Sequence, residues 1–163
     1  MDKPAIWIGN DHGGYELKMK LVARLREQGY EVVDVGSSSG EIVRYPYYAA
    51  KVARAVQRGE AGRGILICST GIGMSIIANR HRGVRASLCT STYMAKMTRA
   101  HNDSNLLCLG GRITGDLEAL DMLDTWLTTP YDGGRHDISL GLLAEAEQAL
   151  ASGKSWEPTG PER

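Results

Sequence analysis

Short apolar runs alternate along the chain with longer segments in which apolar residues recur every three to four positions. The short runs are rich in Val, Ile and Leu, as expected of strands buried in a parallel sheet. The longer segments have the period of helices that bury one face. We predict strands at residues 5–9, 31–35, 64–68, 84–88 and 106–110, each followed by a helical segment.

The helical period is clearest after the first predicted strand, where Leu17, Leu21 and Leu25 share one face. Pro46 suits the first turn of the next helix. Further helices are predicted over residues 72–79, 92–101 and 116–127. This order predicts an α/β fold: a three-layer α/β/α, Rossmann-like arrangement around a five-stranded parallel sheet.

The last part of the chain has a different pattern. Ile138, Leu142 and Leu150 have nearly helical spacing, which predicts a C-terminal helix that packs across a neighbouring element or a partner subunit. Residues 153–163 are rich in Pro and Gly, which disfavour regular structure. We therefore expect one domain over residues 1–152 and an irregular tail over 153–163, in which Trp156 anchors the tail to a surface.

Composition excludes several classes of partner. The 163 residues include 19 Lys and Arg and 19 Asp and Glu, so no net charge draws the chain to nucleic acid or to a membrane. Three cysteines without paired spacing are typical of reduced thiols in a cytoplasmic protein. The N-terminus has neither the basic start of a signal peptide nor an apolar run long enough to span a membrane. We expect a cytoplasmic location.

The segment over residues 64–75 carries the most distinctive chemistry. Cys68 ends a predicted strand, and Gly71 and Gly73 follow it at the start of a predicted helix. Backbone N–H groups at a helix N-terminus can hold an anion, and the same position favours the thiolate form of a cysteine. Alternatively, Cys68 only packs and the glycines only turn the chain. This segment alone leaves both interpretations open.

Polar residues also mark other junctions between predicted elements. Asp11 and His12 follow the first strand, where they either cap a helix or contact a substrate. His101 and Asn102 end a predicted helix, where the histidine either complements the helix dipole or acts as an acid or base. We expect these residues to lie on the same edge of the sheet as Cys68.

Two arginines next to glycine, Arg112 and Arg135, could bind phosphate with their guanidinium groups, although single arginines are also common surface charges. The four histidines and three cysteines have no recognisable zinc spacing. The first strand is not followed by the glycine pattern of a dinucleotide site, and a P-loop is absent. The pattern favours chemistry without a metal or cofactor on a small phosphorylated substrate.

A series of short motifs joins these candidates. They are Asp11-His12, Tyr45-Pro46-x-x-Ala49, Ile67-Cys68-x-Thr70-Gly71-Ile72-Gly73-x-Ser75, Ala78-Asn79, Gly83-x-Arg85-Ala86, Arg99-x-His101-Asn102-Asp103-x-Asn105, Gly110-x-Arg112 and Gly133-Gly134-Arg135-His136. In this order, and over roughly residues 5–150, the chain resembles the type B ribose-5-phosphate isomerases and the related galactose-6-phosphate isomerases. Several unusual motifs together are far more specific than any one of them.

The resemblance implies an aldose-ketose isomerase of the pentose phosphate type that works through a cis-enediolate and needs no cofactor. In the family, the residue matching Cys68 is the base that moves a proton between C1 and C2. Some relatives use a glutamate a few residues later instead, where this chain has Met74. The resemblance also makes Thr70 an aid to proton transfer and His101 the acid or base that opens the sugar ring.

The remaining family roles concern substrate binding. Backbone N–H groups near Gly71 and Gly73 would hold the enediolate oxygen, while Asp11 and Asn102 would contact sugar hydroxyls. His12, Arg112 and Arg135 would contact the phosphate. Because family sites are shared between two subunits, the resemblance implies at least a homodimer and leaves a tetramer open.

Two positions depart from the family pattern. Arg44 stands where the family usually has Asp, and Ser139 stands where a second phosphate-binding arginine usually follows Arg135. Both changes could be drift at the surface. The alternative is a different substrate, such as a tetrulose or hexose phosphate, or one whose anion lies near Arg44.

A binding subunit without chemistry is the other class of function to consider. Such a subunit would need the glycines and arginines but not a thiol aimed at carbon. The presence of Asp11, Cys68, Thr70 and His101 together favours an enzyme.

Overall fold

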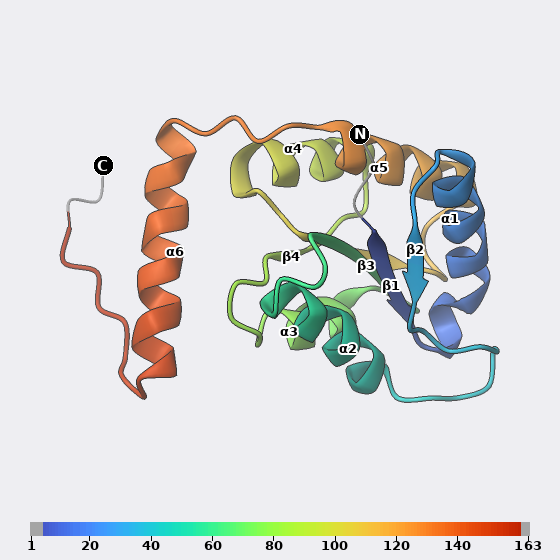
Figure 1. Ribbon diagram of the computed structural model, residues 1–163, viewed down its shortest axis with the longest axis horizontal. Helices are drawn as coiled ribbons and strands as arrows, with labels where there is room; N and C mark the ends of the chain where they lie inside the picture. Colours follow the sequence, from blue (N-terminus) through green and yellow to red (C-terminus); the bar gives the residue numbers. More distant parts are fainter. Residues whose placement is uncertain (1–4, 161–163) are drawn as a thin grey trace.

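The computed structural model describes residues 5–160, so the first four residues of the predicted domain and the last three of the predicted tail lie outside it. Figure 1 shows a sheet between two layers of helices, with one further helix beside it. The strands are β1 (Ile6–Asn10), β2 (Val32–Asp34), β3 (Arg63–Cys68), β4 (Ala86–Leu88) and β5 (Leu106–Gly110). The helices are η1 (His12–Gly14, a 3-10 turn), α1 (Tyr15–Glu27), α2 (Tyr45–Gln57), α3 (Ile72–Ala78), α4 (Thr92–Asn102), α5 (Asp116–Thr128) and α6 (Arg135–Ala151).

All the strand pairs are parallel, in the order β2-β1-β3-β5-β4. The predicted α/β fold with a five-stranded parallel sheet is therefore confirmed. The strands β2 and β4 are shorter than predicted because each lies at an edge and pairs with only one neighbour. The central strand β3 is bonded on both sides and is buried from its second residue to its end.

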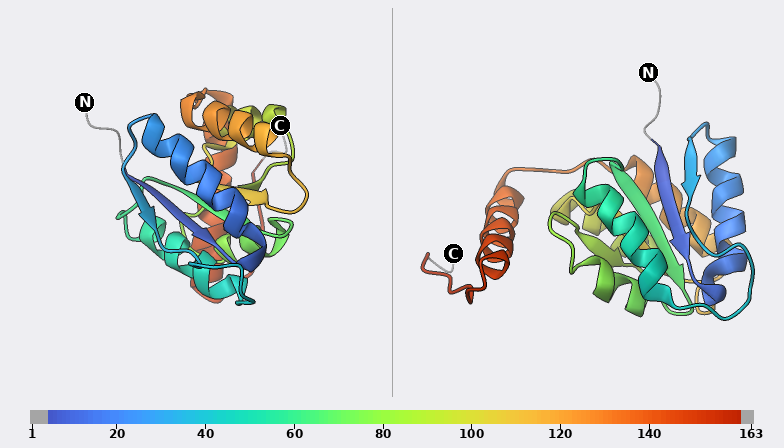
Figure 2. Two further views of the ribbon diagram at one scale, coloured as in Figure 1. Left: turned by 90° about the vertical axis from the view of Figure 1, so that its right-hand side faces the viewer. Right: turned by 60° about the horizontal axis from the view of Figure 1, so that its bottom comes forward.

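Helices cover both faces of the sheet (Figure 2), and the alternation of side chains along the central strands divides the core into two parts. Ile65 and Ile67 point to the face covered by α1, α4 and α5, whereas Leu66 and Cys68 point to the face covered by α2 and α3. Trp126 of α5 fills the first part and donates its indole N–H to the hydroxyl of Ser104, 2.7 Å away. The two cores hold β3 in place, and with it the segment that follows Cys68.

The C-terminal helix α6 stands beside the β4 edge rather than on the sheet, which both figures make plain. It contains no buried residue, and Ile138 and Leu150 are 69% and 68% exposed. A carboxylate of Glu147 accepts the backbone N–H of Gly83 at 3.1 Å, and a cavity of about 390 Å³ lies between α6 and the β4 edge. The apolar side chains that predicted this helix are thus only partly covered within one chain.

Residues 154–159 have no regular structure, and Trp156 is 36% exposed. Across the described part of the chain, every helix is too short or too polar to traverse a lipid bilayer.

Three loops at the carboxyl edge of the sheet pack backbone against backbone. The N–H of Gly111, after β5, donates to the carbonyl of Cys68 at 2.7 Å, and the N–H of Asp11, after β1, donates to the carbonyl of Ile67 at 3.1 Å. A Cβ on Gly111 would lie 2.5 Å from the carbonyl oxygen of Gly13. Glycine at this position is therefore what allows the loops after β1 and β5 to meet beside Cys68.

We expect Gly111→Ala to lower the free energy of unfolding by about 1–3 kcal/mol, since the neighbour that must move is backbone. For a chain of this size that corresponds to a fall of roughly 3–10 °C in Tm, measurable by calorimetry. Gly62→Ala is the matched control, because a Cβ there meets nothing within 4 Å. Equal melting temperatures for the two variants would contradict the close approach as a constraint.

Candidate active site

Cys68 is held at the end of β3 by the turn that begins α3. Its Sγ accepts the backbone N–H of Gly71 at 3.1 Å, and the residue is 5% exposed. Gly71 has a φ of +78°, a left-handed conformation that aims this N–H back at the sulfur. A backbone N–H in this position can donate to the sulfur of a thiolate as well as to that of a thiol. The contact makes Cys68 more than a packing residue.

The other two cysteines have a different environment. Burial raises the pKa of Cys89 to about 12, and burial together with the neighbouring cysteines raises the pKa of Cys108 further. At pH 8 only about one Cys89 in 10⁴ would be a thiolate. Both side chains are enclosed by the core and serve packing. Of the three thiols, Cys68 is the one at the carboxyl end of β3, where it contacts the turn that begins α3.

The N-terminus of α3 forms the floor beside Cys68. The hydroxyl oxygen of Thr70 accepts the N–H of Ile72 at 3.3 Å, which leaves the Thr70 hydroxyl proton free to be donated. The N–H of Gly73 belongs to the first turn and so lacks an intrahelical acceptor. The ring of Tyr45 lies against Gly73, where an added Cβ would come within 2.8 Å of it.

Asp11 and His12 lie in the loop after β1, on the same edge as Cys68. The Oδ1 atom of Asp11 accepts the N–H of Gly13 at 2.8 Å, so the capping role open from the sequence is present. This contact uses one carboxylate oxygen and leaves Oδ2 available to another partner. The Nδ1 atom of His12 lies 3.2 Å from the carbonyl oxygen of Val43, which leaves its Nε2 atom for a ligand.

Arg44 occupies the N-cap position of α2 with no side-chain capping bond. It lines a cavity of about 550 Å³ together with Asp11, His12 and Tyr45. Arg44, which departs from the family pattern, thus lines the same cavity as Asp11 and His12, two predicted substrate contacts. It adds a positive charge to that cavity. Its position makes it a candidate for anion binding.

Arg112 follows β5 and is brought to this edge by its backbone, whose N–H donates to the carbonyl of Ser69 at 3.0 Å. Its side chain is exposed. Arg112 and Arg44 form no ion pair with any carboxylate in residues 5–160. Two unpaired cations therefore flank the edge that carries Cys68.

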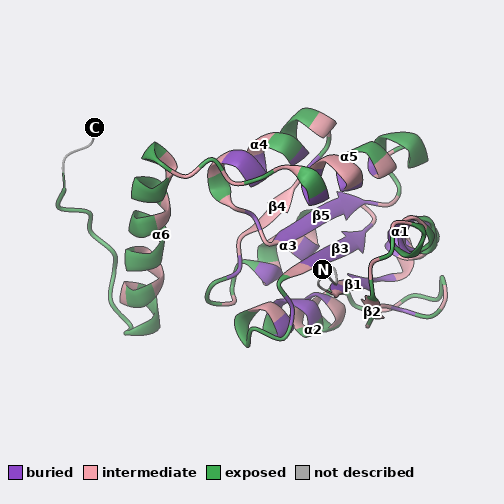
Figure 3. Ribbon diagram, turned by 45° about the horizontal axis from the view of Figure 1, so that its top comes forward, coloured by how far each residue is buried: buried purple, intermediate pink, exposed green. Residues whose placement is uncertain are grey.

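His101, Asn102 and Arg135 lie elsewhere, and the expectation that they share an edge with Cys68 is wrong for a single chain. The carbonyl of Asn102 accepts from Arg85, which immediately precedes β4, so the end of α4 lies where the strands begin. Figure 3 shows the same arrangement, with the arrowheads of β3 and β5 pointing away from α6. At about 3.3 Å per residue, the start and end of β3 are roughly 17 Å apart.

The reason is the direction of the crossover helices. In a βαβ unit the helix runs antiparallel to the strands, so its C-terminus returns to the edge where the next strand starts. The residues after Cys68 follow a strand, whereas His101 ends a helix. One chain thus holds the predicted site residues in two groups, which we call half-sites, one at each edge of its sheet.

Two positioning residues escaped sequence reasoning. Lys18 is 2% exposed, pairs with Asp34 at 2.9 Å and donates to the carbonyl of Ser37 at 2.7 Å. It therefore fixes the start of the loop that leads to Arg44. In the sequence, the only sign of this role is that Lys18 lies next to the apolar face of α1. Tyr45 appeared there only as part of a motif, because its contact with Gly73 joins elements far apart in sequence.

Comparison with known proteins agrees with this geometry. A sequence model described as Ribose/Galactose Isomerase matches residues 6–142. Ribose-5-phosphate isomerase B of Escherichia coli strain K12 is 46% identical over 88% of this chain and 96% of its own. The ribose-5-phosphate isomerase B of Clostridium thermocellum, whose structure has been solved, is 50% identical, with a TM-score of 0.88 over 90% of this chain and 99% of that one.

A third relative has a different activity in its name. The 4-deoxy-4-sulfo-D-erythrose isomerase of Clostridium sp. strain MSTE9 is 38% identical over 90% of this chain and 93% of its own. All three relatives are isomerases by name, and the match to the family sequence model covers most of the chain. With its fold and its motifs, the chain belongs to the ribose/galactose isomerase family.

Proposed function

We propose that this protein interconverts ribose 5-phosphate and ribulose 5-phosphate. The observation that carries the proposal is the hydrogen bond from the N–H of Gly71 to the Sγ of Cys68, at the start of α3. A thiolate stabilised in this way is a base placed at the open edge of the sheet. The Escherichia coli and Clostridium thermocellum relatives, named for ribose 5-phosphate, support this substrate.

The reaction needs one base and no redox partner. The Cys68 thiolate takes the proton from C2 of the open-chain aldose, the electron pair forms the C1–C2 double bond, and O1 becomes the enediolate oxygen. The Cys68 thiol, whose proton can exchange with solvent before it is transferred, then protonates C1. O1 takes up a proton and O2 gives up its hydroxyl proton as the C2 carbonyl forms. The Thr70 hydroxyl assists the transfer between the two oxygens.

Binding groups surround this chemistry. The N–H of Gly73 at the start of α3 stabilises the enediolate oxygen, and loss of one such donor typically costs about 3 kcal/mol of barrier. Asp11 contacts a sugar hydroxyl through Oδ2, and His12 and Arg112 contact the phosphate. From the other edge of a sheet, His101 opens the sugar ring, Asn102 contacts a hydroxyl and Arg135 binds phosphate.

These groups work together only if a second chain supplies the far half-site, so we propose a homodimer as the working unit. The exposed apolar residues of α6 support this. Because α6 has no buried residue within one chain, its apolar side chains are available to pack against a second chain. The three cysteines are free thiols, which supports a reducing, cytoplasmic location.

Solvent exchange tests the chemistry directly. In D₂O the wild-type protein should incorporate deuterium from solvent into ribose 5-phosphate and ribulose 5-phosphate, and Cys68→Ala should lose at least about 10³-fold in exchange rate, because the base that takes the C2 proton is removed. Mass spectrometry of the recovered sugar phosphates measures the label. Cys89→Ala is the matched control and should retain exchange, since that thiol is enclosed by the core. Binding of the sugar phosphate without exchange in the wild type would leave only the role of a binding subunit.

Mixing two inactive variants tests the shared site. Cys68→Ala and His101→Ala dimers, unfolded and refolded together, should regain about one quarter of wild-type activity, since half of the dimers are mixed and each holds one intact site. The assay uses the cyclic form of ribose 5-phosphate, for which ring opening is needed. Size-exclusion chromatography shows that the refolded chains are dimeric. Activity no higher than that of the separate variants would mean that the two residues do not combine across subunits.

A shorter substrate is the second candidate, and the position of Arg44 favours it. Arg44 adds a cation to the cavity of Asp11 and His12, while Ser139 leaves the start of α6 with one cation fewer than the family pattern. The Clostridium relative named for a sulfonated four-carbon sugar supports an anion closer to the reacting carbons. The chain would then prefer a tetrose phosphate or sulfonate.

A substrate panel with Arg44→Ala separates the two candidates. If Arg44 binds the anion of a four-carbon substrate, kcat/KM for erythrose 4-phosphate falls by about 10- to 100-fold in the variant, the value of one charge-assisted hydrogen bond. Activity on ribose 5-phosphate should change less than about threefold, because its phosphate reaches Arg112 and Arg135 instead. Lys51→Ala, which removes an exposed cation about two turns along α2, is the control. Ribose 5-phosphate as the best substrate of the wild type, with Arg44→Ala unchanged toward every sugar, would reject the shorter substrate.

A further inference from the structure

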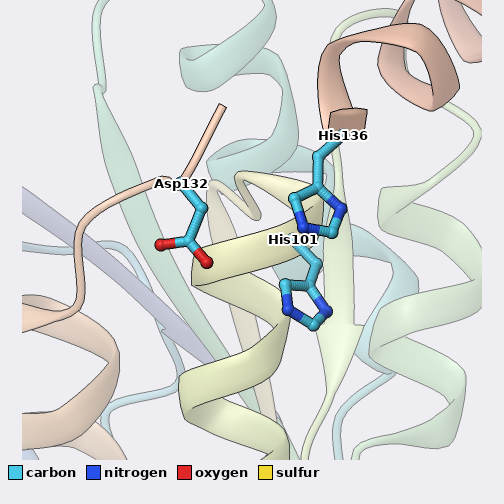
Figure 4. A group of neighbouring side chains, drawn as sticks. All are labelled: His101, Asp132 and His136. Atoms are coloured by element: carbon cyan, nitrogen blue, oxygen red, sulfur yellow. The ribbon is translucent and has the colours of Figure 1, made fainter. Parts of the chain in front are cut away.

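A cluster of metal-binding side chains lies at the edge opposite Cys68. It consists of His101 at the end of α4, His136 in the first turn of α6, and Asp132 in the loop that joins α5 to α6. Figure 4 shows the three side chains side by side, with the Asp132 carboxylate next to the two imidazole rings. They come from positions separated by up to 35 residues, which is why no spacing motif in the sequence indicated them.

The cluster has the dimensions of a metal site that is nearly formed. The imidazole rings stack with their centroids 4.2 Å apart and their planes 16° from parallel. One ligand atom from each residue lies within 4.8 Å of those from the other two. Ligands of a tetrahedral zinc ion, at bonds of about 2.0–2.1 Å, lie about 3.3 Å from one another. Binding an ion therefore requires the two stacked rings to turn apart, so that one nitrogen of each faces the ion.

The backbone holds the cluster together before any ion binds. The N–H of Asp132 donates to the carbonyl of Ala100 at 2.9 Å, which ties the loop to the last turn of α4 beside His101. Part of the cost of bringing the ligands together is thus already met by folding.

The carboxylate of the cluster is also uncommitted. Asp137 accepts the hydroxyl of Tyr131 at 2.8 Å, and Asp103 is paired with Arg85 and Arg99. Asp132 has no ion pair or side-chain hydrogen bond within residues 5–160. Two imidazoles with one free carboxylate form a ligand set that suits Zn²⁺ and related transition metals, whereas Mg²⁺ and Ca²⁺ prefer oxygen ligands.

We propose that His101, Asp132 and His136 form a binding site for a divalent transition metal ion such as Zn²⁺, and that the bound ion inhibits the enzyme. The inhibition rests on the proposed role of His101 in ring opening. A ring nitrogen coordinated to metal can neither accept nor donate a proton, so the cyclic substrate is no longer opened. Both histidines are half-buried and Asp132 is exposed, so the ion can enter from solvent and leave to a chelator.

Metal binding is measured without reference to activity. Isothermal titration of the untagged, full-length protein with ZnCl₂ should give one ion per chain, and the absorption spectrum of the Co²⁺ form should show nitrogen and oxygen ligands without a thiolate charge-transfer band. His136→Ala and Asp132→Asn should each weaken binding at least tenfold. His81→Gln is the matched control, because His81 lies outside the cluster and bonds to the carbonyl of Ile77. Circular dichroism verifies that each variant is folded.

Activity then tests the consequence. Wild-type turnover of cyclic ribose 5-phosphate should fall over the same Zn²⁺ range that fills the site and return with EDTA, while His136→Ala should need at least tenfold more Zn²⁺. Metal binding unchanged in both His136→Ala and Asp132→Asn would overturn the site. Inhibition unchanged in His136→Ala, or a thiolate band from Co²⁺, would assign the inhibition to Cys68 and overturn the regulatory part. Failure of the protein to isomerise any sugar phosphate would remove the proposed function but leave the binding measurement intact.

Discussion

The close contact of three backbone segments at the carboxyl edge of the sheet determines most of what this molecule can do. The carbonyls of Ile67 and Cys68, at the end of β3, accept N–H groups from the loops after β1 and β5. Such contacts require that no side chain lie between the backbone segments. Gly111 satisfies this requirement, because a Cβ at this position would collide with the carbonyl oxygen of Gly13. Because the donors are backbone groups, the geometry around Cys68 is independent of flexible side chains. The base of the proposed reaction is therefore fixed by the fold itself.

The same parallel architecture also explains why one chain is insufficient for the proposed reaction. Strand ends and helix ends lie at opposite edges of the sheet, so Cys68 and His101 are separated by the length of β3. No side-chain rotation covers a distance of that size. A site that uses both residues needs a second copy of the chain. The helix α6, which carries Arg135 and leaves its apolar residues exposed, is the element with surface available for that contact.

The sequence predicted the fold well because its signals are local. Alternating apolar runs and helical periods located all five strands and the helices around them. The largest errors in the strands are at the ends of β2 and β4, where sheet-edge position decides the length. The site was only partly predictable. Cys68, Thr70 and Gly71 are neighbours in the chain, whereas the contacts of Lys18 with Ser37 and of Tyr45 with Gly73 depend on tertiary packing. The edge predicted for His101 was wrong because α4 runs antiparallel to the strands and ends at the opposite edge of the sheet.

The residues of the proposed site differ in how firmly the structure holds them, and this decides which of them can change. Cys68 is bound by backbone hydrogen bonds on both sides, and moving it would disrupt β3 and the turn into α3. Arg44, Arg112 and Arg135 are exposed and form no ion pairs within the described chain, so a cation can be gained or lost there at little cost in stability. In the proposed site, the cations can therefore change while Cys68 and its backbone contacts stay the same. Arg44 together with Ser139 is a change of this kind, which would alter the charge around the substrate without altering the base.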